Sequence, residues 1–190
     1  MIAVLFALER EAAPFRRAAR ALTGVSVHVS GVGRECACEA ANRLVGNNPS
    51  SVIAAGFCGA LVPALRVGDI VRSPRIVTVD HLVTDPAEKR RLGASHDAVD
   101  MESAAVEEVC AAAGVPFLAV RAVSDAVDTA LSPGLVKMLA GGKVSVMRAC
   151  AALVRRPALL GEFLRLARDT KRAARNLARE LVRLVASPTP

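Results

Sequence analysis

The chain has 190 residues, of which 53% are hydrophobic, and its 25 Lys and Arg against 18 Asp and Glu give a net charge of +7. This length favours one domain and provides ample apolar material for a buried core. With no Trp or Tyr and five Phe, the sequence lacks the aromatic residues on which many nucleic-acid binders stack bases, so we expect no nucleic-acid partner.

Strand-like and helix-like segments alternate along the first two thirds of the chain. The apolar periodicity predicts strands at 2–8, 25–30, 51–55, 68–71, 76–83 and 117–122, and helices at 11–22, 34–45, 86–92 and 100–113. A turn is expected at Gly56–Gly59, directly after the third strand. The alternation predicts an α/β fold with a largely parallel sheet.

The C-terminal segment has a different composition. Residues 148–190 contain ten Lys or Arg against three Asp or Glu. An apolar stripe with helical spacing runs through Leu160, Phe163, Ala167, Ala174, Leu177, Leu181 and Leu184. We predict a basic amphipathic helical extension over 148–190. Two interpretations of its stripe stay open: a packing surface, and a face that lies on an anionic membrane.

Cysteine usage and apolar runs indicate the compartment. The five cysteines form no CxxC pair, and the three histidines show no metal-ligand spacing, which predicts buried thiols in a reducing cytoplasm and no metal site. No apolar run approaches the roughly 18 residues that a membrane span needs. We expect a cytoplasmic protein, with peripheral contact at the inner membrane if the C-terminal stripe faces lipid.

Carboxylates stand where ligands of α/β sheets gather. Glu11 follows the first strand, Asp100 and Glu102 begin a helix, and Asp125 follows the last predicted strand. Taken singly, Asp125 would be a helix cap and Glu102 an acid stabilised by the helix dipole. Together they suit cleavage of an N-glycosidic bond, because one acid can protonate the leaving base while another carboxylate stabilises a cationic sugar.

Four stretches, 3–12, 30–44, 52–71 and 98–128, resemble the superfamily of nucleoside phosphorylases and methylthioadenosine nucleosidases. The most specific part is an ordered pair of segments, Val-Asp-Met-Glu-Ser at 99–103 and Arg-Ala-Val-Ser-Asp at 121–125. The resemblance implies a single-domain twisted mixed sheet flanked by helices, with residues 1–147 as the catalytic domain. It also implies a homo-oligomer, a small-molecule adenine nucleoside as partner, and no cofactor, with inorganic phosphate as a potential co-substrate.

The same resemblance assigns roles to single residues. Asp125 matches the acid that protonates the purine, and Glu11 matches the acid that handles the nucleophilic water. Glu102 matches the carboxylate that binds the ribose hydroxyls, and Met101 matches the residue that packs on the sugar. We expect Arg121 to orient Asp125. The expected substrate-binding set is completed by Leu82, Val83 and Ser124.

The sequence departs from many family phosphorylases at the phosphate site. The Arg and the Ser or Thr that hold phosphate are replaced by Ala54 and Phe57. Backbone N–H groups at glycine-rich helix starts can bind an anion without those side chains. The phosphate-binding candidates are therefore Gly33, Arg34, Gly56 and Gly59.

The short middle of the chain, the segment 78–92 and the basic C-terminus are most similar to the hopanoid-associated phosphorylases. This implies phosphorolysis of a lipid-linked adenosine, adenosylhopane, with release of adenine. Two alternatives stay open. One is hydrolysis of methylthioadenosine or adenosylhomocysteine. The other is a non-catalytic nucleoside-binding or membrane-adaptor protein.

Overall fold

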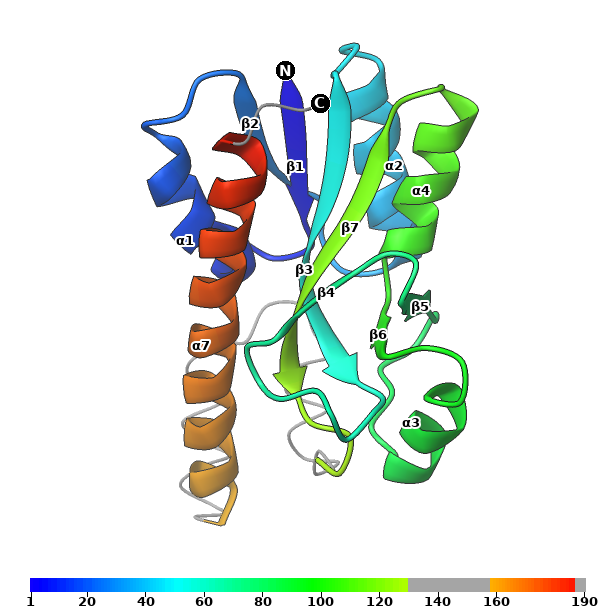
Figure 1. The fold of residues 1–190 in the computed structure, drawn as a ribbon, viewed down its shortest axis with the longest axis vertical. Coiled ribbons are helices and arrows are strands. Elements are labelled where there is room, and N and C mark those ends of the chain that lie inside the picture. The colour runs from blue at the N-terminus through cyan, green and yellow to red at the C-terminus, as the bar shows by residue number, and fades with distance from the viewer. Residues whose placement is uncertain (130–157, 187–190) are drawn as a thin grey trace.

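The computed structural model describes residues 1–129 and 158–186, and the domain boundary expected at 147/148 lies outside them. Helices and strands alternate along the described chain, as the sequence predicts (Figure 1). In chain order they are β1 (Ile2–Phe6), α1 (Glu9–Ala19), β2 (Val25–Val29), α2 (Arg34–Val45), β3 (Ser51–Ala60), β4 (Ile70–Arg72), β5 (Ile76–Thr78), α3 (Pro86–Leu92), β6 (Ala98–Asp100), α4 (Ser103–Ala112), β7 (Phe117–Asp125) and α7 (Ala158–Ala186).

The strands of the described chain form one mixed sheet of seven strands, which confirms the expected α/β class. β2, β1, β3 and β7 are neighbours in that order and run parallel. The other end of β3 pairs antiparallel with β6, and β4 pairs antiparallel with β7. β3 and β7 therefore lie side by side at the centre of the sheet, where β7 carries side chains of the candidate site and β3 lies against them.

Helices cover both faces of this sheet (Figure 1). α1 and α7 pack on one face, around a core that includes Phe6, Phe15 and Leu177. α2 and α4 pack on the other face, around Leu5, Leu44 and Val106. Burial on both faces explains why β1 is a continuous apolar run instead of an alternating one.

The apolar stripe of α7 packs within the chain along its second half. Leu177 and Leu181 are buried in the core shared with α1 and the sheet, and Ala174 is also buried, whereas Ala167 and Leu164 are exposed. The side chains of Leu160 and Phe163 lie outside the described residues. The packing interpretation thus describes the second half of the stripe. No helix in the described ranges is long and apolar enough to cross a bilayer.

Two predicted element boundaries are wrong near the centre of the sheet. The turn expected at Gly56–Gly59 does not exist, because β3 continues to Ala60 and pairs with β7 through these glycines. The helix expected from Asp100 begins at Ser103, because 98–100 form β6 against β3. In both places pairing with a distant strand overrides the local pattern.

Candidate active site

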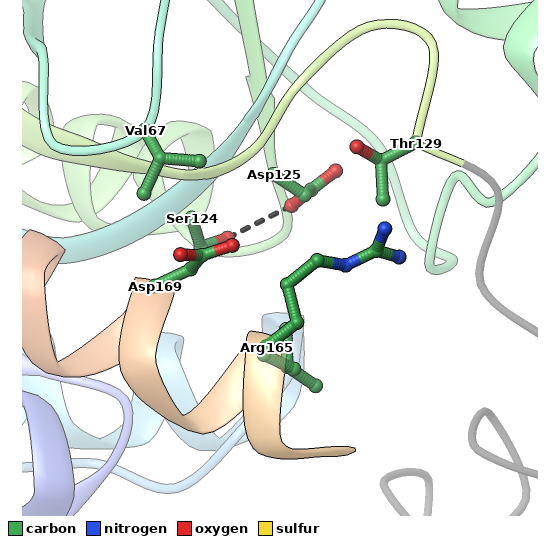
Figure 2. Close-up of a pocket in the computed structure, with 7 residues that line it drawn as sticks. Val67, Ser124, Asp125, Thr129, Arg165 and Asp169 are labelled. Atoms are coloured by element: carbon green, nitrogen blue, oxygen red, sulfur yellow. Dashed lines mark hydrogen bonds between the residues drawn. The ribbon is translucent and has the colours of Figure 1, made fainter. Parts of the chain in front are cut away.

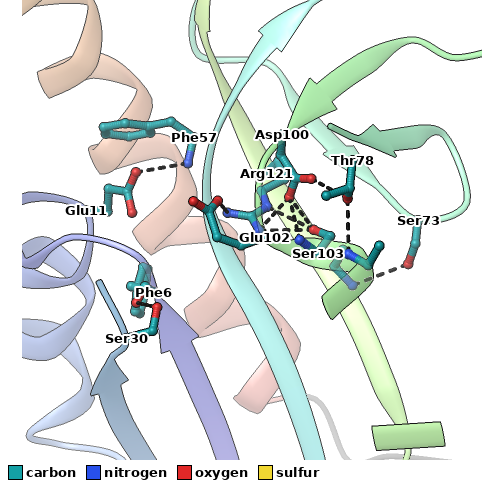
Figure 3. A network of polar contacts seen from close by, with 12 residues as sticks. Phe6, Glu11, Ser30, Phe57, Ser73, Thr78, Asp100, Glu102, Ser103 and Arg121 are labelled. Atoms are coloured by element: carbon teal, nitrogen blue, oxygen red, sulfur yellow. Dashed lines mark hydrogen bonds and ion pairs between the residues drawn. The ribbon is translucent and has the colours of Figure 1, made fainter. Parts of the chain in front are cut away.

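A buried arginine organises the polar interior of the protein (Figure 3). Arg121 projects from β7, and its side chain is only 2% exposed. Its Nη2 lies 2.5 Å from Oδ2 of Asp100 and donates to Oγ of Ser103 at 3.0 Å. Its Nη1 lies 3.9 Å from Oε2 of Glu102. A guanidinium keeps its charge in the interior, so these carboxylates offset the cost of burying it.

Asp100 fixes the turn between β6 and α4. Its Oδ2 accepts from the backbone N–H of Ser103 at 3.1 Å, and its Oδ1 accepts from Oγ1 of Thr78 at 2.6 Å. The Thr78 hydroxyl in turn accepts from the N–H of Ala104 at 3.0 Å. These hydrogen bonds tie the turn to β5 and to the first residues of α4, and they fix the backbone from which the Glu102 side chain projects.

Glu102 connects the arginine to the start of α2. One carboxylate oxygen, Oε1, accepts from the backbone N–H of Gly33 at 3.0 Å, and the other faces Arg121. Gly33 has a φ of 97°, a left-handed conformation that aims its N–H at the carboxylate and that favours glycine. Glu102 is buried and held at both oxygens, and its remaining lone pairs can accept two hydroxyl groups of a sugar.

Glu11 is a buried carboxylate in the first turn of α1. Its Oε2 accepts from the N–H of Leu8 at 3.1 Å, and its Oε1 accepts from the N–H of Phe57 on β3 at 3.3 Å (Figure 3). Burial raises the pKa of Glu11 to about 7, against the lowering effect of the Arg121 guanidinium. A carboxyl group that titrates near neutrality is suited to general base catalysis.

Gly56 and Gly59 make room for these side chains on β3. A Cβ at Gly56 would overlap Nη1 of Arg121 and would lie 3.2 Å from Oε2 of Glu11. A Cβ at Gly59 would lie 3.2 Å from Oδ2 of Asp125. The glycines that the sequence suggested as a turn therefore permit close approach within a strand.

Asp125 ends β7 and is held by two donors. Its Oδ1 accepts from Oγ of Ser124 at 2.8 Å, and its Oδ2 lies 2.5 Å from Nζ of Lys89. Lys89 comes from α3 and is fully buried. Its ammonium also donates to the carbonyl groups of Ala126 at 3.1 Å and Thr129 at 3.3 Å. All three donors of the lysine are thus used, and Asp125 has a fixed position.

Lys89 is the site residue that the sequence did not single out. We expected Arg121 to orient Asp125, but Arg121 binds Asp100 and Ser103, and Lys89 takes that position. Lys89 precedes Arg90 and Arg91, so it resembles part of a solvated charge run. Its position on the helix distinguishes Lys89 from the neighbouring arginines, because the three-residue spacing puts Lys89 on the same face of α3 as Pro86 and Leu92.

A small pocket opens beside Asp125 (Figure 2). It has a volume of about 70 Å³ and is lined by Ser124 and Asp125 from β7 and by Arg165, Leu166 and Asp169 from α7, together with Val67 and Thr129. Enclosed sites for small molecules usually measure roughly 300 Å³ or more. This pocket is therefore large enough for one part of a nucleoside only.

The other predicted substrate-binding residues take different positions. Met101 is half-buried in the bend between β6 and α4, next to Glu102. Val83 is buried against Leu61 and Val99, whereas the Leu82 side chain is 44% exposed. The structure thus places Met101 and Ser124 directly beside the acids and leaves Leu82 on the surface.

The four phosphate-binding candidates do not share one helix start. Gly33 is the N-cap of α2, and its N–H donates to Glu102. Arg34 is exposed and pairs with Glu108 on α4. Gly56 and Gly59 lie within β3. Among the described residues, no group of three His, Cys, Asp or Glu could hold a metal ion.

Comparison with known proteins confirms the fold. Residues 75–156, less than half of the chain, match the family described as the phosphorylase superfamily. The methylthioadenosine/adenosylhomocysteine nucleosidase of Neisseria meningitidis, solved with methylthio-immucillin-A, is 20% identical with a TM-score of 0.70, covering 98% of this chain and 99% of that chain. The corresponding Helicobacter pylori enzyme is 16% identical with a TM-score of 0.69, covering 97% of each chain.

A third similar structure is the futalosine hydrolase of Helicobacter pylori, which is 16% identical with a TM-score of 0.70, covering 97% of this chain and 96% of that chain. No curated protein matches this chain significantly in sequence. At these identities the likeness establishes the mixed α/β fold with its C-terminal helix.

Proposed function

We propose that this protein is an enzyme that cleaves the N-glycosidic bond of an adenine nucleoside. The observation that carries the proposal is the arrangement of three carboxylates around the β3–β7 pair. Glu11 and Glu102 flank the buried Arg121, which projects from β7. Asp125 is the last residue of β7. Similar folds occur in proteins named as methylthioadenosine/adenosylhomocysteine nucleosidases, and these names support an adenine nucleoside as substrate. Another similar fold belongs to a futalosine hydrolase.

Each carboxylate has a task in the proposed reaction. Asp125 donates a proton to a ring nitrogen of the purine as the bond to the sugar breaks, and Lys89 Nζ, 2.5 Å away, can supply that proton. Glu102 accepts hydrogen bonds from the ribose hydroxyls and stabilises the cationic sugar. Glu11 takes a proton from a water molecule whose oxygen bonds to C1′. The products are the free base and a sugar hydroxyl.

The geometry favours water over phosphate as the nucleophile. Glu11 is buried, and its pKa of about 7 lets it accept a proton near neutrality. Phosphorolysis of a lipid-linked adenosine is the second candidate. It is favoured by the N-terminus of α2, where the Gly33 N–H donates to Glu102 and Arg34 is the first helical residue. In that reaction the exposed basic residues of α7 would meet an anionic membrane surface.

The test is adenine release from adenosine, methylthioadenosine and a 5′-alkylated adenosine, each with and without phosphate. We expect phosphate-independent release, and a loss of about 100-fold or more in Asp125→Asn with unchanged circular dichroism. Asp128→Asn is the matched control, because Asp128 is an exposed surface carboxylate paired with Arg90, and it should retain normal rates.

The other outcomes separate the candidates. Release that requires phosphate and is strongest for the alkylated substrate would establish the second candidate. Normal turnover in Asp125→Asn would contradict the assignment of the acid. No release of adenine from any of the three substrates by the wild-type protein would contradict an enzymatic function.

A further inference from the structure

A second, larger groove lies outside the carboxylate site, between α1 and α7. These helices lie side by side on one face of the sheet (Figure 1). The groove has a volume of about 310 Å³. Its apolar lining includes Pro14 of α1, Phe57 of β3 and Ala174 of α7. Ala174 is only 4% exposed, so the floor is recessed below the molecular surface.

Four cations surround this apolar floor. Arg10 and Arg17 come from α1, and Lys171 and Arg175 come from α7. On each helix the spacing, seven residues on α1 and four on α7, puts both side chains on the face that borders the groove. All four side chains are exposed, and the described lining contains no Asp or Glu.

In the described part of the chain, no carboxylate pairs with these four cations. This holds for every side chain that the structure describes, a set that leaves out 130–157, 158–160, 162, 163 and 187–190. The neighbouring acids are engaged elsewhere, since Glu9 pairs with Arg16 at 3.0 Å and Asp169 pairs with Arg168 at 3.4 Å. Residues 130–157 contain no Asp or Glu in their sequence. Four like charges around one cavity raise its affinity for anions.

We propose that this groove binds a small phosphorylated molecule, with its phosphate charges on the four cations and its apolar part on the Phe57 floor. Guanidinium and ammonium groups are the side chains that bind phosphate oxygens most strongly. The volume lies in the range of small-molecule sites, which starts at roughly 300 Å³. A flat bilayer surface would reach the rim but not the recessed Ala174, so the groove fits a soluble ligand.

The groove is adjacent to the carboxylate site without sharing its acids. Phe57 lines the groove, and its backbone N–H donates to Oε1 of Glu11 at 3.3 Å (Figure 3). A bound ligand would thus contact Phe57, the residue whose backbone N–H binds the carboxylate of the proposed base, Glu11. The proposal rests on α1 and α7 and holds whether or not the nucleoside reaction does, because binding is measured without turnover.

Calorimetric titration with inorganic pyrophosphate and with phenyl phosphate, at fixed ionic strength, tests the proposal. We expect one site per chain. The double variant Arg17→Gln/Lys171→Gln should weaken the binding of both probes by about tenfold or more. The control Arg20→Gln/Arg43→Gln removes the same net charge from outside the groove lining and should change affinity by less than about twofold.

Three results would overturn the proposal. The first is an absence of binding by the wild-type protein. The second is an equal loss in the two double variants, which would indicate general attraction to a molecule of net charge +7. The third is a result in which the wild-type protein binds anionic phosphatidylglycerol vesicles but neither soluble probe. If only Arg17→Gln/Lys171→Gln then lost vesicle binding, this surface would be a membrane contact.

Discussion

At the scale of single residues, the Lys89–Asp125 pair is the contact on which the proposed acid depends most. The lysine is fully buried and donates to Asp125 and to two carbonyl oxygens. Removing its charge leaves the carboxylate in a site with one remaining donor, Ser124. Breaking a buried pair costs more than replacing both partners, because an unpaired charge stays behind.

We therefore predict that Lys89→Met lowers the free energy of unfolding by about 3 kcal/mol. Adding Asp125→Asn to this variant should restore part of the loss, although Asp125→Asn alone is destabilising. Urea denaturation of the four proteins in a double-mutant cycle measures the coupling. Additive losses would mean that the two side chains do not interact in the folded protein.

Glu11 predicts a specific dependence of stability on pH. Its pKa is about 7 in the folded protein against an ordinary value of 4.5, so the folded state binds the proton more tightly. The stabilising contribution is complete below pH 4.5 and is lost as the pH rises through 7. Relative to Glu11→Gln, the wild-type protein should lose about 3 kcal/mol across this window.

Denaturation of both proteins between pH 4.5 and 8 checks this difference in slope. Glu9→Gln is the control, because Glu9 is an exposed carboxylate in the same helical turn. If Glu11 is the base, kcat/KM should also rise through about pH 7 in the wild-type protein. Parallel stability curves for wild type and Glu11→Gln would show that the carboxyl group titrates normally.

At the scale of elements, local signals were sufficient where helix caps decide the structure. α2 spans the predicted residues 34–45, and α3 begins at Pro86 behind Asp85, whose Oδ1 accepts from the N–H of Ala87 at 3.0 Å. Prediction from the local sequence was wrong where pairing with a distant strand determines the structure. Gly56 indicates a turn by local rules, but it lies in β3 because this strand pairs with β7 through it. The Arg121 side chain occupies the space that a Cβ at Gly56 would fill.

The candidate site divides in the same way. The places of Glu11, Glu102 and Asp125 in the fold could be predicted, because strand ends and a helix start are visible in the sequence pattern, whereas their proposed roles come from the family resemblance. The partners that hold them could not be predicted. Lys89 is 36 residues from Asp125 along the chain, and Gly33 is 69 residues from Glu102. Local periodicity does not reveal such pairings, so the positions of the acids were predictable and their hydrogen bonds were not.

At the scale of the whole molecule, the remaining question is whether α7 belongs to the folding unit or extends from it. The sequence permits both, because one apolar stripe serves packing and membrane binding equally well. The structure places Leu177 and Leu181 in the core with Phe6 and Phe15. Leu164, on the same helix, is 58% exposed.

This contrast gives a prediction with its control on the same helix. Leu177→Ala should lower the free energy of unfolding by about 3 kcal/mol, because it opens a cavity in a core that α7 shares with the sheet. Leu164→Ala should change it by less than about 0.5 kcal/mol.

Hydrogen exchange of the β1 and β7 amides distinguishes the two interpretations. In one cooperative unit, Leu177→Ala accelerates exchange in the strands by the same free energy as in α7. Faster exchange confined to α7, with the strands unchanged, would show that the helix is an extension that folds separately.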